Sequence, residues 1–162
     1  MGSQPVNIFL SWSHKDVALK KHLVDLLEDD LAILTDVDLR WWEDSHLLCG
    51  EEFGSEIQAR IDQADYGLML LTPAYLNSTF VERYEWPRFI GAKADKGALP
   101  VALGQLAAFD GSRDFRGIEK HQVFFLEGCA YSQLRGRRPE FAQRLATEVR
   151  RRILGLGGYR SL

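Results

Sequence analysis

Two glutamates and a large aromatic ring stand close together after the apolar run 66–71: Glu82, Glu85 and Trp86. In a helix of about 3.6 residues per turn, Ser78, Glu82 and Glu85 fall along one face, and Trp86 lies beside Glu82. A carboxylate beside hydroxyl groups and large aromatic rings is suited to binding a ribose and a flat base. The pattern therefore indicates the rim of a binding site.

Simpler interpretations of these residues stay open. Glutamates in helices are usually solvated or form ion pairs, here with Arg83 or Arg88. The four histidines, at positions 14, 22, 46 and 121, do not have the spacing of metal ligands. The sequence therefore predicts no metal site.

Further polar and aromatic side chains follow the apolar runs. They are Ser11, Trp12 and Ser13 after the first run, Trp42 and Asp44 after the second, and Thr72 after the third. In open parallel sheets, ligands bind at the carboxyl ends of the strands, near the point where the strand order reverses. We therefore expect these side chains to share one rim with Glu85. Ser11 and Ser13 could instead cap the helix that follows them.

Alternating strands and helices must position these side chains. Short apolar runs predict strands at 6–11, 37–42, 66–71, 98–103 and 122–126. Apolar residues at helical spacing predict helices at 16–27 and 51–64, a helix that opens near Pro73, and a closing helix at 139–154. The alternation predicts an α/β domain of the flavodoxin-like, doubly wound class, with a five-stranded, mainly parallel sheet and helices on both faces. The stretch 105–120 is expected to be a loop with one short helix.

The length of 162 residues and the apolar content of 46% suit one domain with a substantial core. We assign residues 1–155 to this domain, and residues 156–162 to a C-terminal tail or the start of a linker to a further domain. Cys49 and Cys129 have no paired spacing, which favours a reducing, cytoplasmic location. No apolar run approaches the roughly 20 residues of a membrane span, so we expect no membrane contact.

Arginines gather in the stretch 135–152, although the net charge of the chain is −3. They could form a surface for nucleic acid or for an acidic protein, or simply a solvated helix face. Because no aromatic residues are interleaved with them to stack on bases, we expect no direct binding of nucleic acid.

Three motifs, in order along roughly the first 90 residues, resemble the TIR (Toll/interleukin-1 receptor) domain family, particularly its bacterial members. They are Ile8–Asp16, then Trp42-Glu43-Asp44 followed by Gly50, Glu51, Phe53 and Ile57, and then Thr72–Phe80 continuing to Glu85-Trp86-Pro87. The chain departs from the family pattern at Thr72, where Ser is frequent, at Cys49, where Pro is frequent, and at Trp86, where an aliphatic residue is common. None of these departures removes a reacting group.

The resemblance implies an NAD+ glycohydrolase, which cleaves the bond between nicotinamide and ribose and gives ADP-ribose or a cyclic isomer. It implies Glu85 as the catalytic carboxylate, with Glu82 as the second choice. The substrate-binding residues that it implies are Ser11, Trp12, Ser13, Trp42, Asp44, Thr72, Ser78 and Glu82. Trp42 or Trp12 would stack on the nicotinamide, and the segment 11–13 would meet the diphosphate. The reaction would need no metal and no cofactor, since NAD+ is the substrate.

The resemblance also implies a homo-oligomer or filament held by TIR–TIR contacts, acting in bacterial antiphage defence, with a possible sensor domain after this segment. Leu47, Leu48 and Phe53, in or next to the loop after the second strand, would be contact residues, unless that loop is an ordinary surface connection. A non-catalytic TIR adaptor that signals through homotypic contacts is the main alternative. A phosphoacceptor receiver domain would need an acidic Mg²⁺ cluster near the first strand, which residues 11–13 do not supply.

Overall fold

The computed structural model describes residues 5–43, 53–78 and 81–155 of the chain. Several expectations fall outside this part: those for Asp44, Leu47, Leu48 and Cys49, and those for the side chains of Trp42 and Phe53. They stay predictions.

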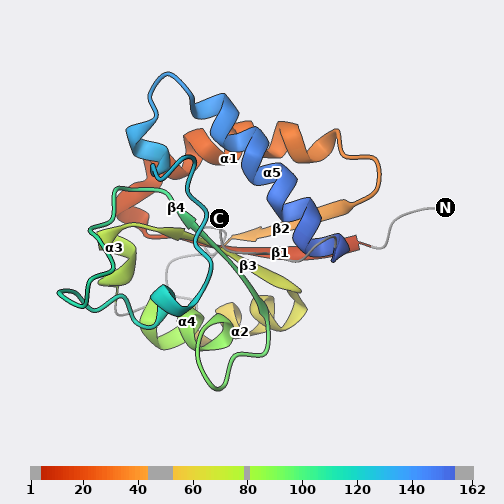
Figure 1. Ribbon diagram of the computed structural model, residues 1–162. Helices are drawn as coiled ribbons and strands as arrows, with labels where there is room; N and C mark the ends of the chain where they lie inside the picture. The colour runs from red at the N-terminus through yellow and green to blue at the C-terminus, as the bar shows by residue number, and fades with distance from the viewer. Residues whose placement is uncertain (1–4, 44–52, 79–80, 156–162) are drawn as a thin grey trace.

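Within these described residues, four parallel strands form the sheet at the centre of the molecule (Figure 1): β1 (Pro5–Ser11), β2 (Asp38–Glu43), β3 (Tyr66–Leu71) and β4 (Gly97–Ala102). Their order is β2-β1-β3-β4. Ile8 of β1 lies opposite Trp41 on one side and Tyr66 on the other. The strand order therefore reverses between β1 and β3, and the carboxyl ends of these two strands form the switch point at which sheets of this class bind ligands.

The fifth predicted strand, 122–126, adds a single pair of residues to the edge of the sheet. Phe124 forms a parallel bridge with Val101 of β4, and its N–H donates to the carbonyl of Pro100 at 2.9 Å. The chain then reverses through Glu127 and Gly128, whose φ angles are 51° and 78°. This tight turn ends the pairing because it leads the chain away from β4.

Helices cover both faces of the sheet (Figure 1). On one face, α1 (Val17–Ala32) and α5 (Arg138–Leu154) lie side by side, and the other face carries α2 (Phe53–Gln63), α3 (Pro73–Leu76) and α4 (Trp86–Phe89). The predicted flavodoxin-like α/β class is thus confirmed. Helix α1 is longer than predicted because Leu31 continues its buried stripe beyond residue 27. The stretch 105–120 is irregular and ends in the short 3₁₀ helix Ile118–Lys120, as expected.

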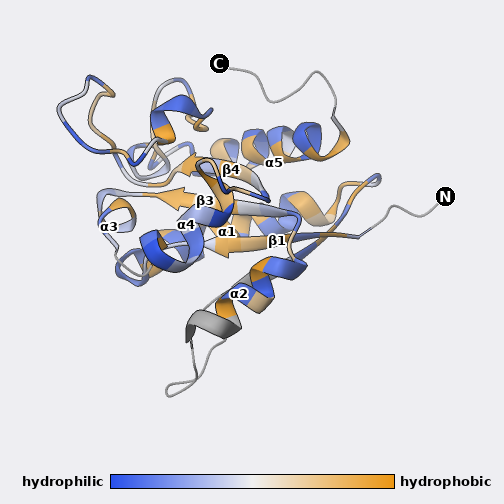
Figure 2. Cartoon of the chain, turned by 90° about the horizontal axis from the view of Figure 1, so that it is seen from below, coloured by the Kyte–Doolittle hydropathy of each residue, from blue (hydrophilic) through white to orange (hydrophobic). Residues whose placement is uncertain are grey.

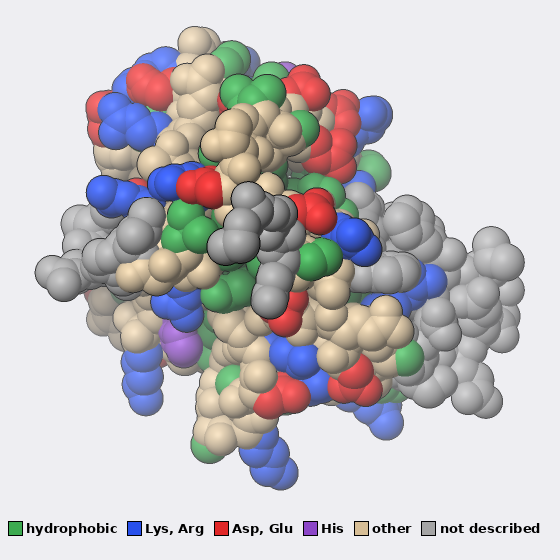
Figure 3. Space-filling model, turned by 90° about the vertical axis from the view of Figure 1, so that its right-hand side faces the viewer, with side chains coloured by type: hydrophobic (Ala, Val, Ile, Leu, Met, Phe, Trp, Pro, Cys, Tyr) green, Lys and Arg blue, Asp and Glu red, His purple; other side chains and the backbone are tan. Residues whose placement is uncertain are grey.

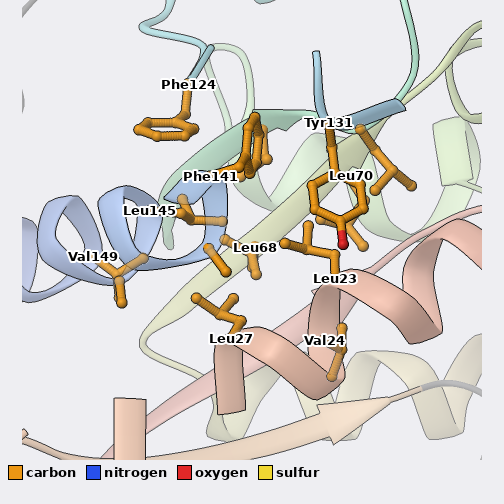
Figure 4. Close-up of a cluster of buried hydrophobic side chains, with 14 of the residues drawn as sticks. Leu23, Val24, Leu27, Leu68, Leu70, Phe124, Tyr131, Phe141, Leu145 and Val149 are labelled. Atoms are coloured by element: carbon orange, nitrogen blue, oxygen red, sulfur yellow. The ribbon is translucent and has the colours of Figure 1, made fainter. Parts of the chain in front are cut away.

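The space between the sheet and the α1/α5 pair is filled with apolar side chains (Figure 4). Phe141, Leu145 and Val149 of α5 stand at intervals of four residues and point toward Leu68 and Leu70 of β3, and each of the five is at most 1% exposed. Fully burying such a side chain contributes about 1.5–3 kcal/mol. The strands are mostly hydrophobic along their length, whereas the helices carry hydrophilic residues as well (Figure 2), because the sheet is covered on both sides.

The helix predicted from Pro73 onward is interrupted, which corrects the expectation that Ser78, Glu82 and Glu85 share one helical face. Helix α3 ends at Leu76, a π-helical turn occupies Val81–Glu85, and α4 begins at Trp86. A regular α-helix cannot run through this point because Pro87 has no N–H to bond the carbonyl four residues earlier. The wider π turn changes the direction in which side chains project, so that Glu85 is buried and Glu82 is exposed.

Charges of both signs are interspersed on the face that Figure 3 shows, at the amino end of β1. Three arginines of the C-terminal stretch form ion pairs, namely Arg137 with Glu127 and Glu140, Arg150 with Asp36, and Arg151 with Glu148. For these three, the pairing favours the solvated-face interpretation over a binding surface. Among the helices of the described residues, none combines the length and the apolar character that crossing a bilayer requires.

Candidate functional site

Glu85 lies at the carboxyl edge of the sheet, next to the end of β1 at the switch point, and none of its surface is exposed. The hydroxyl of Ser11, the last residue of β1, donates a hydrogen bond of 2.6 Å to Glu85 Oε1. Ser11 is itself fully buried. A carboxylate removed from water is unfavourable unless hydrogen bonds compensate it, so the Ser11 hydroxyl is part of what holds Glu85 in place.

Tyr75 of α3 completes this group of buried polar side chains. Its hydroxyl lies 2.7 Å from Ser11 Oγ, and its surface is fully buried. Because the single proton of the Ser11 hydroxyl is donated to Glu85, the Tyr75 hydroxyl is the donor in the second bond. The chain of bonds therefore runs from Tyr75 through Ser11 to Glu85 and orients the carboxylate from two elements of the fold.

Thr72 connects the end of β3 to the loop after β1. Its hydroxyl accepts from the N–H of Tyr75 at 3.0 Å, which caps α3, and donates to Asp16 Oδ2 at 2.5 Å. The cap sets the start of α3, and with it the place of the Tyr75 ring. Thr72 thus supports the buried group through the start of α3, which carries Tyr75.

Trp12 and Ser13, although next to Ser11 in sequence, are directed elsewhere. The Trp12 ring belongs to the apolar cluster under α1 and α5, stacks on His14 at 4.8 Å between ring centroids, and has Lys20 Nζ 4.4 Å from its centre. Successive strand residues face opposite sides of a sheet, so Trp12 and Glu85 are separated by β1 itself. Ser13 caps the short 3₁₀ helix His14–Asp16 by accepting from the N–H of Lys15.

Ser78 and Glu82 also serve local roles. Ser78 Oγ accepts a hydrogen bond of 3.2 Å from the N–H of Val81, at the entry to the π turn. Glu82 is exposed and forms an ion pair of 2.7 Å with Arg116. The structure therefore brings together Ser11 and Glu85 from the predicted set, whereas the contacts of Trp12, Ser13, Ser78 and Glu82 are with other groups.

Two residues of this region, Tyr75 and Arg116, were not among the predicted site residues. Tyr75 had a detectable signal, because it stands one helical turn before Ser78 on the same expected face. Arg116 had none, since it is one arginine in a polar loop and reaches α3 and the π turn only through the tertiary fold.

Beside the site, a cavity of about 670 Å³ lies between α3 and the loop 105–116. Its lining mixes apolar, amide and charged side chains, among them Leu76, Asn77, Leu106, Arg113 and Arg116. Glu85 does not line it. A ligand can therefore reach the carboxylate only after the groups that cover Glu85 have moved.

The arrangement is that of an oriented carboxylate shielded from bulk solvent. Such a group can accept hydrogen bonds from sugar hydroxyls and stabilise positive charge that develops on a neighbouring carbon, and it does so more strongly than in bulk solvent. Within the described residues, no group of three or more His, Cys, Asp or Glu side chains is arranged to hold a metal ion.

The family model for the TIR domain matches residues 8–145. Comparison with curated proteins gives no match, and neither does comparison with solved structures. The matched range extends from β1 into α5 and contains the whole Ser11, Tyr75 and Glu85 group. It covers well over half of the chain, which therefore belongs to the TIR domain family.

Proposed function

We propose that this TIR domain is an NAD+ glycohydrolase with Glu85 as its catalytic carboxylate. The observation that supports the proposal best is the complete burial of Glu85 at the switch point of the sheet, with its carboxylate held by the Ser11 hydroxyl. A glutamate with a merely structural surface role would be solvated or bound to a guanidinium, as Glu82 is.

In the proposed reaction, the bond between the anomeric carbon of the ribose and the nicotinamide nitrogen breaks, and both electrons leave with nicotinamide as a neutral base. The ribose then carries the positive charge as an oxocarbenium-like species, which the Glu85 carboxylate stabilises. Water attacks the anomeric carbon and loses a proton to give ADP-ribose. Attack by a ring nitrogen of the adenine gives a cyclic isomer instead. No metal or further cofactor enters this scheme.

The burial of Glu85 also supports activation by self-assembly. TIR domains act through TIR–TIR contacts, and a carboxylate without exposed surface needs a rearrangement before substrate can bind. A homo-oligomer or filament would supply that rearrangement, triggered by a sensor domain outside this segment. Bacterial antiphage defence, in which NAD+ loss halts the infected cell, is the setting that we propose, with the protein in the cytoplasm and without direct contact to nucleic acid.

The test is NAD+ turnover by the purified chain at high protein concentration, with nicotinamide and ADP-ribose isomers identified by mass spectrometry. Glu85→Gln keeps the size of the side chain and an acceptor for Ser11 but removes the charge. We expect it to lower kcat by at least about 10²–10³-fold, the loss typical of removing one electrostatic stabiliser. Glu119→Gln, the same change at an exposed glutamate of the 3₁₀ helix Ile118–Lys120, is the control and should leave kcat unchanged.

Two results would count against this function. Equal turnover in the Glu85→Gln variant and the wild type would reject Glu85 as the catalytic group. Assembled protein that leaves NAD+ intact under every condition would favour the non-catalytic adaptor instead.

A further inference from the structure

Arg116 connects the irregular loop after β4 to the segment that carries Glu85. Its Nε donates to the carbonyl of Leu76, the last residue of α3, at 2.6 Å. Its Nη1 lies 2.7 Å from Glu82 Oε1, inside the π turn. Its own carbonyl accepts a hydrogen bond of 3.2 Å from Trp86 Nε1, directly after Glu85. One residue therefore contacts this segment before, within and after the π turn.

The backbone of Arg116 is held in an unusual conformation that aims its guanidinium at α3. Its φ angle is 55°, in the left-handed region that non-glycine residues rarely adopt. Asp114 stabilises the bend by accepting from the N–H of Arg116 at 2.8 Å. The neighbouring Phe115 and Ile118 are 6% and 0% exposed and fix the loop in the apolar cluster that also contains Trp86. A strained residue held by its surroundings in this way is frequently functional.

The contacts of Arg116 continue to the buried carboxylate. The Trp86 ring packs on the Tyr75 ring with 6.2 Å between centroids, and the Tyr75 hydroxyl binds Ser11, which binds Glu85. A displacement of the π turn would therefore move Glu85 relative to Ser11.

We propose that Arg116 is a positioning residue for Glu85: it fixes the π turn so that the carboxylate meets the Ser11 hydroxyl. It acts on Glu85 through its contacts with Leu76, Glu82 and Trp86. The kinetic consequence of this role rests on the proposed glycohydrolase function, whereas the structural consequence, a rigid turn at 81–85, does not.

The test uses the full chain and two measurements on each variant. Hydrogen exchange followed by mass spectrometry reports on the amides of 81–90, and steady-state kinetics with NAD+ separate kcat from KM. Arg116→Ala should speed exchange in 81–90 by about tenfold or more and lower kcat about 10- to 100-fold with KM changed less than about threefold, since a misplaced reacting group costs turnover rather than binding. Arg116→Lys keeps a charge for Glu82 and should recover part of both losses.

Arg113→Ala is the matched control because Arg113 is exposed and belongs to the same loop, and its side chain binds only its neighbour Ser112 in the contacts described. It should match the wild type in hydrogen exchange at 81–90. Wild-type exchange in Arg116→Ala, or an equal loss of exchange protection in Arg113→Ala, would overturn the proposal.

If Arg116→Ala does not fold, Glu82→Gln replaces it. Amide exchange that is faster than in the wild type only at 81–90 supports the proposal, and wild-type exchange there overturns it. If wild-type protein leaves NAD+ intact, the function fails while the exchange data still decide the role of Arg116.

Discussion

At the scale of single residues, the neighbours Ser11 and Trp12 show how one strand end serves two purposes. Ser11 faces α3 and α4 and binds Glu85, whereas Trp12 faces α1 and α5 and joins the larger core. Both are buried, at 0% and 3% exposure. The alternation of strand side chains thus places a polar anchor and an apolar one on opposite faces of β1.

Ser11→Ala tests the anchor. Because the variant removes the hydroxyl that donates to the buried Glu85 carboxylate, we expect the free energy of unfolding to fall by about 1–3 kcal/mol, the usual cost of removing one partner of a buried hydrogen bond. Urea denaturation at neutral pH measures it. Ser132→Ala, the same change at a half-buried serine whose backbone N–H binds Leu103, is the control and should change stability by less than about 0.5 kcal/mol. Equal stability of Ser11→Ala and the wild type would show that the bond does not hold Glu85.

At the scale of elements, the packing of α4 on β3 depends on a position without a side chain. A Cβ atom at Gly67 would lie 2.4 Å from Cε1 of Phe89, which is only 2% exposed. The glycine lets α4 approach the strand closely, and α4 follows directly on the turn that contains Glu85. The depth of Glu85 in the fold is therefore set in part by this contact.

Gly67→Ala should destabilise the protein by about 1–3 kcal/mol, because the Phe89 ring, which is almost fully buried, would have to shift to admit the methyl group. Gly97→Ala is the matched variant, since its Cβ would lie 2.5 Å from the ring of Tyr66, which is half-buried and can turn toward solvent. Thermal unfolding of both variants measures the difference. A larger loss in Gly97→Ala than in Gly67→Ala would contradict this account.

At the scale of the whole molecule, an ion pair ties the last helix to the first half of the chain. Arg150 of α5 binds both carboxylate oxygens of Asp36, which lies 114 residues earlier, just before β2. The hydrogen bond to Arg150 is the main cause that lowers the pKa of Asp36 below its ordinary value. The carboxylate therefore binds protons less readily in the folded chain than in the unfolded one.

This difference predicts a loss of stability in acid. A lowered pKa in the folded state gives stability that is present above the unfolded pKa of about 4 and is lost as the pH falls through the folded value. Asp36→Asn should therefore be less stable than the wild type at pH 6, with the difference shrinking below about pH 4. Urea midpoints between pH 6 and pH 3 measure it. Arg150→Gln should remove the same pH-dependent part, and a difference that stays constant with pH would contradict the coupling.

Local pattern was enough to predict most of the architecture. The strands at 66–71 and 6–11 were predicted almost to the residue, because a strand covered on both faces is a continuous apolar run. The segment 122–126 pairs less than predicted, since its apolar pattern does not reveal the turn at Glu127 and Gly128 that ends the pairing.

For the site, the residue pattern was enough to predict the kinds of groups and the edge of the sheet at which they lie: hydroxyls at the ends of β1 and β3, and two glutamates beyond them. The pattern did not reveal that Glu85 is buried against Ser11 while Glu82 is exposed and paired with Arg116, because this depends on tertiary packing. The physical reason is that a periodic pattern gives the spacing of side chains within one regular element. The direction of a side chain after a π turn, and a contact between residues far apart in the chain, depend on how separate elements pack.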